Sequence, residues 1–306
     1  MTVSLSTTPR SMAEQPPQAV CSRRVKVVKW AERQVKKLDA LPRLLRDPVR
    51  RAARLLFDGA SIGLLRPKDV DELVEVGYQE QWIVYDPRHY ALPHDEQMLP
   101  VLQKLATGTN LLDAFCGQGR EAELLAKAGF IVTGVDRLPE MIDGARKYAN
   151  EQDFDATFVT ADFANYDDSS TFDVVYPSCW MYSTIQGARR RQAFLQKCHK
   201  LCAPSGLVVI SFDIRVGSFV VGFAKHLIAR ITGFVTRGNL RSEPGERITS
   251  GGLFWQCHTE ESVCREVCAA GFDVVETVKG TENDVAFLFL SPVDGAASKQ
   301  QSGDAA

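Results

Sequence analysis

The 306-residue sequence lacks three features, and each absence narrows its class. None of its eight cysteines forms a CxxC pair, so the ligand pairs of zinc modules are missing and no metal site is predicted. No uninterrupted apolar run reaches the roughly 20 residues that a spanning helix needs. The first residues lack the apolar stretch of a secretory signal peptide. We therefore expect a soluble protein in a reducing, cytoplasmic setting, with its thiols free.

Net charge is also small, but its distribution is uneven. The formal net charge of -2 argues against binding of polyanions through bulk electrostatics, so nucleic acid is not an expected partner. Between residues 23 and 54, however, 12 basic residues are opposed only by Glu32, Asp39 and Asp47. We expect this basic arm to be either a solvated helical face or a contact for a membrane surface or an acidic partner.

The sequence divides into four parts. Residues 1–20 are rich in Ser, Thr, Pro and Gln, which predicts a disordered tail. Residues 21–94 read as a helical N-terminal extension, interrupted by Pro42 and Pro48. The main domain is predicted over 95–292, with an irregular insert at 214–257 that contains one helix. Residues 293–306 are small and polar, and we expect a second loose tail.

Within the main domain, strand-like and helix-like segments alternate. Strands are expected at 110–115, 130–136, 156–162, 171–177, 205–213, 272–280 and 284–292. Helices are expected at 121–129, 139–152, 187–202 and 259–271, the third placing Cys198 and Cys202 on one helical face. The connection between the last two strands is too short for a parallel crossover. The pattern predicts an α/β fold: a seven-stranded, mainly parallel, Rossmann-like sheet with helices on both faces and an antiparallel last strand.

The most informative segment is the glycine-rich stretch Leu112–Glu121, which lies between a predicted strand and a helix. In open α/β sheets, ligands bind at the carboxyl ends of the strands, where the strand order reverses. Gly117 and Gly119 allow a ligand to approach the backbone closely. The next two strands end in Asp136 and Asp162, whose carboxylates can accept hydrogen bonds from ribose hydroxyls and from an adenine amino group.

These motifs, in this order, resemble the cofactor half of class I S-adenosylmethionine-dependent methyltransferases, and the resemblance covers roughly residues 95–292. It implies S-adenosylmethionine as the cofactor and in-line methyl transfer to a small, partly apolar acceptor. The first motif would surround the methionine moiety, and the end of the fourth strand would line the methyl-transfer site. The cofactor-binding residues that the resemblance implies are Asp113, Ala114, Phe115, Gly117, Gly119, Asp136, Arg137, Asp162, Phe163, Pro177 and Ser178.

The sequence departs from the family pattern at two points. Phe115 replaces the first glycine of the usual acid-x-G-x-G-x-G motif, a form that also occurs in methyltransferases acting on amino groups of nucleic-acid bases. Those enzymes carry N/D-P-P-Y/F after the fourth strand, whereas this chain has Tyr176–Trp180, which reads YPSCW. The change disfavours base methylation, which stays an alternative.

Two further alternatives remain. The glycine pattern alone also fits a nicotinamide-dinucleotide fingerprint. Asp113, four residues before Gly117, would repel a pyrophosphate and attract the sulfonium of S-adenosylmethionine, so it favours the methyltransferase over the oxidoreductase. A protein that binds the cofactor without turnover is the other alternative.

The catalytic residues are not identified by the sequence. Tyr176, Tyr182 and His258 are candidates for a general base, although such residues more often pack or cap. Aromatic and apolar residues of the extension and the inserts would either cover an apolar acceptor or form core: Tyr78, Trp82, Tyr85, Tyr90, Trp180, Met181, Tyr182, Phe219, Phe223, Leu227, Phe234, Phe254 and Trp255.

Overall fold

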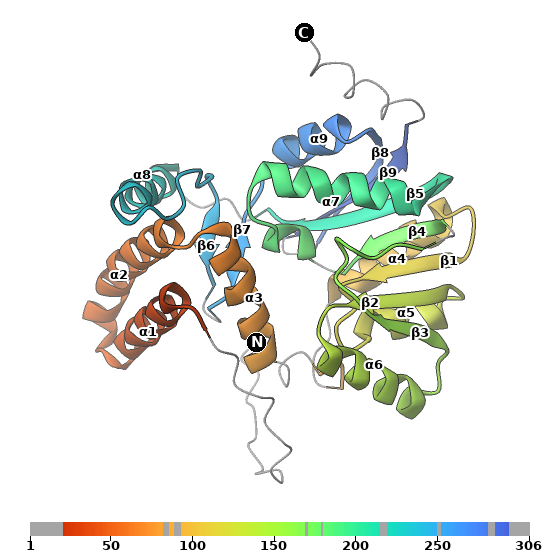
Figure 1. The fold of residues 1–306 in the computed structure, drawn as a ribbon, viewed down its shortest axis with the longest axis horizontal. Helices are drawn as coiled ribbons and strands as arrows, with labels where there is room; N and C mark the ends of the chain where they lie inside the picture. The colour runs from red at the N-terminus through yellow and green to blue at the C-terminus, as the bar shows by residue number, and fades with distance from the viewer. Residues whose placement is uncertain are drawn as a thin grey trace.

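The fold is taken from a computed structural model, which describes residues 21–81, 86–88, 93–168, 171–178, 180–214, 219–249, 252–280 and 285–293. Figure 1 shows a layered sheet domain beside a group of N-terminal helices, joined by the insert after β5. The predicted tails lie outside the described residues, except for Val293. So do Cys179 and the turn predicted around residues 281–283.

The sheet has seven strands in the order β3-β2-β1-β4-β5-β9-β8. The strands β1 to β5 run parallel, and β9 is antiparallel to both β5 and β8. This arrangement confirms the predicted fold class. The bounds are β1 Asn110–Ala114, β2 Ile131–Asp136, β3 Ala156–Thr160, β4 Phe172–Pro177, β5 Cys202–Asp213, β8 Phe272–Lys279 and β9 Val285–Pro292.

Both faces of the sheet are covered by helices, which follows from the apolar runs in the strands. Successive residues of a strand point to opposite faces, so Leu111 and Leu112 enter two different hydrophobic clusters. One cluster includes residues of α7 and α9, and the other includes residues of α4, α5 and α6. These helices are α4 Pro93–Leu105, α5 Arg120–Lys127, α6 Pro139–Gln152, α7 Ala188–Leu201 and α9 Glu260–Ala269.

The N-terminal extension and the insert together form a second layer with its own core. A third cluster joins apolar residues of α1, α2, α3, α8 and the two short strands β6 and β7. The hairpin β6–β7 was not predicted from the sequence, whereas the single helix of the insert is confirmed. The bounds are α1 Arg23–Lys37, η1 Leu38–Ala40, α2 Arg43–Leu64, α3 Pro67–Gln81, α8 Phe219–Thr236, β6 Glu246–Ile248 and β7 Phe254–Gln256.

Two local expectations were wrong. Pro48 lies inside α2 without ending it, because a proline in the second turn removes one backbone hydrogen bond while the rest of the helix packs along α8. Cys202 does not share a helical face with Cys198, because α7 ends at Leu201 and Cys202 begins β5. The start of β5 is irregular, with a register shift against β4 between Phe172 and Val174.

Glycine allows α2 and α8 to approach each other. A Cβ added to Gly63 would lie 2.3 Å from the backbone oxygen of Ala229, whereas a Cβ on Gly222 of α8 would meet nothing within 4 Å. We expect Gly63→Ala to lower the free energy of unfolding by about 1–3 kcal/mol, because the helices must separate. The same change at Gly222 should raise it by up to about 1 kcal/mol through helix propensity. Urea denaturation of both variants measures the difference; equal effects would contradict the close approach.

Candidate functional site

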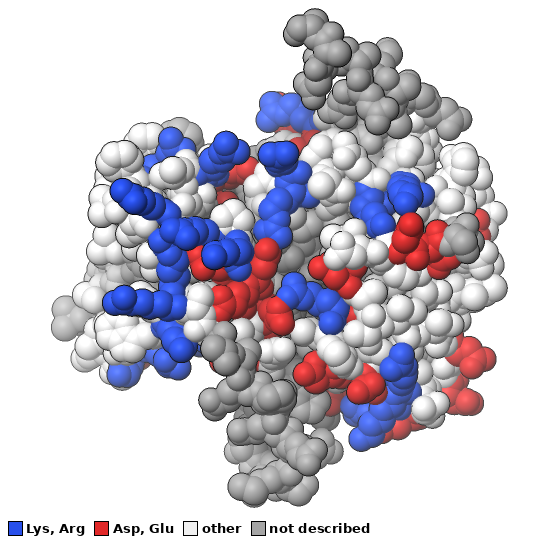
Figure 2. All heavy atoms as spheres, viewed as in Figure 1, with Lys and Arg blue, Asp and Glu red and all other residues white. Residues whose placement is uncertain are grey.

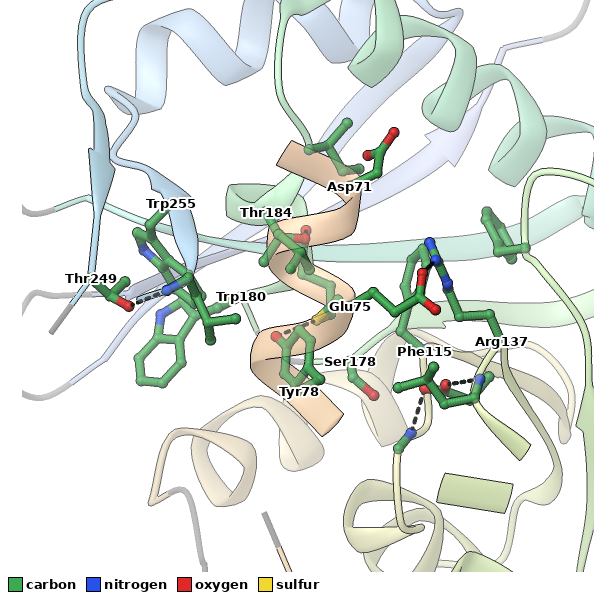
Figure 3. Close-up of a pocket in the computed structure, with 18 of the residues that line it drawn as sticks. Asp71, Glu75, Tyr78, Phe115, Arg137, Ser178, Trp180, Thr184, Thr249 and Trp255 are labelled. Carbon is green, nitrogen blue, oxygen red and sulfur yellow. Dashed lines mark hydrogen bonds and ion pairs between the residues drawn. The ribbon is translucent and has the colours of Figure 1, made fainter. Parts of the chain in front are cut away.

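A cavity of about 1600 Å³ lies at the carboxyl ends of β1, β2, β3 and β4, between the sheet and the N-terminal helices. This is the edge at which open α/β sheets bind ligands, and the strand order reverses there between β1 and β4. Figure 3 shows the two sides of the cavity: Phe115, Arg137 and Ser178 on one, and Trp180 and Trp255 on the other, with α3 between them.

The glycine-rich loop after β1 forms part of the cavity wall through Phe115, Gly117 and its neighbours. Phe115 adopts a φ of 62°, the left-handed conformation that glycine favours. The phenylalanine therefore keeps the backbone path of the glycine that it replaces, at a cost of about 1–2 kcal/mol. Its ring packs against those of Phe163 and Phe194, at centroid distances of 5.4 and 6.0 Å, and this contact offsets the cost.

Gly117 and Gly119 have φ values of 53° and 84°. A Cβ added to Gly117 would meet nothing within 4 Å, so the backbone at this point borders open space in the cavity wall. Gly119 lies behind it and precedes the first residue of α5, against Ala145 and Phe158. The loop therefore presents bare backbone to the cavity at one glycine and packs closely on α6 and β3 at the other.

Asp136 lines the cavity at the end of β2. Its carboxylate accepts hydrogen bonds from the backbone N–H of Gly117 at 3.1 Å and of Leu138 at 2.9 Å. Burial raises the pKa of Asp136, although these backbone hydrogen bonds favour its ionised form. Asp136 thus joins the loop after β1 to the end of β2, and it places a carboxylate in the wall.

Asp162 and Phe163 follow β3 and also line the cavity. Asp162 is exposed, and its carboxylate accepts a hydrogen bond from the backbone N–H of Ala164 at 3.0 Å. Phe163 is buried, with its ring 5.4 Å from that of Phe194. A flat group bound near Asp136 would therefore meet an acid and an aromatic edge here.

Not every residue suggested for the cofactor reaches the cavity wall. Asp113 is fully buried, and its carboxylate accepts a hydrogen bond from the Ser178 hydroxyl at 2.8 Å. Ser178 itself lines the cavity, so Asp113 supports the wall from behind. Ala114 and Pro177 are paired neighbours in β1 and β4, and they too lie behind the lining.

Helix α3 borders the cavity through Asp71, Val74, Glu75 and Tyr78, of which the sequence identified only Tyr78. The Asp71 carboxylate pairs with Arg190 of α7 at 2.7 Å, and Glu75 pairs with Arg137 after β2. The Tyr78 hydroxyl lies 3.5 Å from the sulfur of Met181, in the short helix η2, Met181–Thr184. The spacing of Asp71, Glu75 and Tyr78, i, i+4 and i+7, is the signal that marks a shared helical face.

The far wall of the cavity is built around Asp213 at the end of β5. Its buried carboxylate accepts hydrogen bonds from Arg247 at 2.7 Å and from the indole nitrogen of Trp255 at 2.9 Å. Arg247 and Trp255 are opposite each other in the β6–β7 hairpin. The centroids of the Trp180 and Trp255 rings are 6.1 Å apart at an interplanar angle of 69°, so the two indoles form a corner in which Asp213 holds Trp255. The far wall of the cavity is therefore aromatic, and the guanidinium of Arg247 lies beside it.

The three candidates for a general base lie outside the cavity lining. Tyr176 is fully buried in the core beneath α4 and α5. The Tyr182 hydroxyl donates to Glu266, and burial raises the pKa of this tyrosine far above its usual value. Burial lowers the pKa of His258 to about 4, and its ring packs against Tyr182 and Phe212. These three side chains pack in the core.

The described aromatic and apolar residues that were expected over an acceptor separate into three groups. Tyr78, Trp180, Met181 and Trp255 line the cavity, whereas Tyr182 and Phe254 are core. Phe223, Leu227 and Phe234 do not cover the cavity; they are exposed on α8. Trp82, Tyr85, Tyr90 and the Phe219 side chain lie outside the described residues. Among the residues that the structure describes, no group of His, Cys, Asp or Glu is arranged to hold a metal ion.

Comparison with known proteins identifies the kind of domain to which the strands around this cavity belong. Residues 111–206 match the family model described as a methyltransferase domain. Over 106 residues the chain is 33% identical to a ubiquinone biosynthesis O-methyltransferase of Caulobacter sp. (strain K31), covering 34% of this chain and 40% of that protein. Over 105 residues it is 31% identical to the enzyme of the same name from Coxiella burnetii, covering 34% and 43%. The chain thus spans less than half the length of these relatives.

Solved structures extend the likeness to the whole fold. The 1,6-didemethyltoxoflavin-N1-methyltransferase of Burkholderia thailandensis aligns with a TM-score of 0.57 and 16% identity, over 76% of this chain and 92% of that one. An S-adenosylmethionine-dependent methyltransferase from Clostridium acetobutylicum aligns with a TM-score of 0.51 and 12% identity, over 71% and 99%. At these identities the likeness establishes the fold. The chain carries a methyltransferase domain with the class I, Rossmann-like fold.

Proposed function

We propose that this protein transfers a methyl group from S-adenosylmethionine to a small, partly apolar acceptor. The observation that carries the proposal is the meeting of Gly117, Asp136 and Phe163 on one wall of the cavity, beside an aromatic corner. The matched domain and the names of the relatives support the same activity. The relatives named for ubiquinone biosynthesis further favour a small molecule as the acceptor.

The cavity wall fits this cofactor. Gly117 borders open space, so the methionine part can approach the backbone there. Asp136 offers carboxylate oxygens to the ribose hydroxyls, and Asp162 with Phe163 offers an acceptor and a ring to the adenine. Ser178 and Phe115 would border the methyl group. When bound, S-adenosylmethionine supplies a methyl group activated by its positively charged sulfur.

The protein's own part in this reaction is to position and enclose the reactants. Asp136 and the loop after β1 hold the donor, while Trp180 and Trp255 present flat apolar surfaces to an acceptor. Helix α3 excludes water through its contacts to Arg137 and Met181. Since Tyr176, Tyr182 and His258 do not reach the lining, the proposal assigns proton removal to none of them.

Calorimetric titration with S-adenosylhomocysteine and with NAD tests the cofactor directly. We expect the first ligand to bind with a micromolar Kd, and the second not to bind. The reason is charge: Asp136 and Asp162 line the donor side and repel the pyrophosphate of a dinucleotide, whereas the nearby cations Arg120 and Arg137 are held in ion pairs with Glu121 and Glu75. Binding of NAD alone would show an oxidoreductase. Binding of S-adenosylhomocysteine, with no transfer of labelled methyl to any small molecule of a cell extract, would show a non-catalytic binder.

A further inference from the structure

Helix α8 is apolar on two opposite sides, and only one of them is covered. Its inner side packs on α2, where Ile228 and Ala229 approach Gly59 and Gly63. Its outer side carries Phe223, Leu227, Ile231 and Phe234, spaced i, i+4, i+8 and i+11 and therefore aligned along the helix. These four side chains are 62%, 49%, 57% and 79% exposed. A helix that only closes a core does not need this second apolar stripe.

One more side chain on α8 widens the stripe. Val235 is 73% exposed and follows Ile231 by one turn. The outer surface of α8 therefore presents a group of large apolar side chains, which we call the α8 face: Phe223, Leu227, Ile231, Phe234 and Val235.

The exposed charged side chains of α8 and the loop that follows it are basic. Residues 219–242 contain no Asp or Glu, and Arg230, Arg237 and Arg241 are exposed. The fourth cation of this stretch, Lys225, faces α2 and pairs with Asp58 at 3.6 Å. Helix α1 adds seven Lys or Arg against a single acid, Glu32. Figure 2 shows Lys and Arg side chains gathered over the part of the surface that α1 and α2 occupy in Figure 1.

Helix α1 repeats the pattern on a smaller scale. Its exposed positions include Val27 and Trp30, which are 46% and 59% exposed. Arg23, Lys26 and Arg33 lie at helical spacings around them and are also exposed. Tryptophan ringed by cations is typical of a helix that lies at a membrane surface, where the indole sits among lipid headgroups.

We propose that the α8 face and the cationic α1 dock this protein onto the surface of an anionic lipid bilayer. The apolar stripe enters the boundary between headgroups and acyl chains, and the surrounding Lys and Arg contact lipid phosphates. No helix among the described residues is long and apolar enough to cross a membrane. A second copy of the chain is a poorer occupant, because a twofold contact through the α8 face would bring the exposed cations of two copies, Arg230, Arg237 and Arg241, into the same interface.

Vesicle sedimentation tests the docking on the full chain. We expect the protein to pellet with vesicles of equimolar phosphatidylcholine and phosphatidylglycerol, and to pellet much less with phosphatidylcholine alone. A double variant, Phe223→Ser with Phe234→Ser, should bind the anionic vesicles at least ~10-fold more weakly, because each phenylalanine loses apolar burial in the membrane. Both side chains are largely exposed, so the thermal midpoint should hardly change.

A matched control is Ile131→Ser, which removes an apolar side chain that is 66% exposed on β2, away from α8. This variant should pellet as the wild type does. Equal pelleting of the wild type and the double variant would overturn the proposal, as would the absence of binding to anionic vesicles. A wild-type dimer that the double variant converts to monomer would also overturn it, in favour of a second copy. The readout is independent of methyl transfer, so it is distinguishable from a failure of the proposed activity.

Discussion

Replacing Arg191 with leucine is expected to lower the free energy of unfolding by about 3–5 kcal/mol. The Arg191 side chain is 2% exposed, and its guanidinium donates two hydrogen bonds to Glu266, at 2.7 and 2.8 Å. It donates one more to Glu243 and one to Gln256, both at 2.8 Å. One side chain of α7 therefore holds together α9, the loop before β6, and β7.

The large effect comes from the partners that would be left behind. Without the guanidinium, the carboxylates of Glu266 and Glu243 lose the cation between them, and the side-chain oxygen of Gln256 loses a donor inside the protein. The pKa of Glu243 shows this dependence: burial would raise it, but the hydrogen bond and charge of Arg191 hold it below its usual value. Glu266 also accepts the Tyr182 hydroxyl, so the loss extends to η2.

The adjoining residue supplies the control. Arg190 is 43% exposed and makes one ion pair with Asp71, so Arg190→Leu should cost about 0–1 kcal/mol. Urea denaturation of the two variants, followed by circular dichroism, compares the same chemical change at neighbouring positions. If both variants unfolded at the same denaturant concentration, the network around Arg191 would not be a main source of stability.

Replacing Asp136 with alanine is expected to weaken binding of S-adenosylhomocysteine by about 100-fold or more, measured by calorimetry. In the proposed complex the carboxylate accepts two ribose hydroxyls, and hydrogen bonds to a charged group contribute about 1.5–3 kcal/mol each. The change also removes the acceptor for the N–H groups of Gly117 and Leu138, which hold the loop in place. The lost ribose hydrogen bonds and the loosened loop both weaken binding of S-adenosylhomocysteine.

Two further variants separate charge from local structure. Asp136→Asn keeps a side-chain acceptor for the loop but loses the charge, so its affinity should lie between those of the wild type and Asp136→Ala. Asp143→Ala removes an acid from the exposed side of α6, where it pairs with Arg146, and it should bind like the wild type. An Asp136→Ala variant with wild-type affinity would place the ribose elsewhere and remove the basis of the proposed function.

The sequence predicts the sheet well because each of its strands carries a local signal. Apolar runs that end in acids or prolines mark β2 and β4, and the short link before β9 fixes its direction. Asp136 was identifiable because it ends such a run. Pro48 led to a wrong prediction of an interrupted helix, because packing of α2 against α8 decides the helix boundary as well as the proline does.

The far wall of the cavity could not be predicted in the same way. Strands β6 and β7 have three residues each, too few to show a period, and Asp213 meets Arg247 across 34 positions of the chain. The face of α3 was visible as a spacing, but its partners Arg137, Met181 and Arg190 come from three separate elements. In the sequence, Tyr182 and His258 are candidates for a general base. Only their burial in the structure shows that they are core residues.

In the proposed complex, the ion pair between Glu75 and Arg137 would connect the donor side of the cavity to the helix that borders the acceptor side. Arg137 directly follows Asp136, and Glu75 lies one turn from Tyr78 on α3. A shift of α3 that opened the acceptor side would therefore also pull at the end of β2. Turnover in such a site would depend on the movement of α3 as well as on the transfer step.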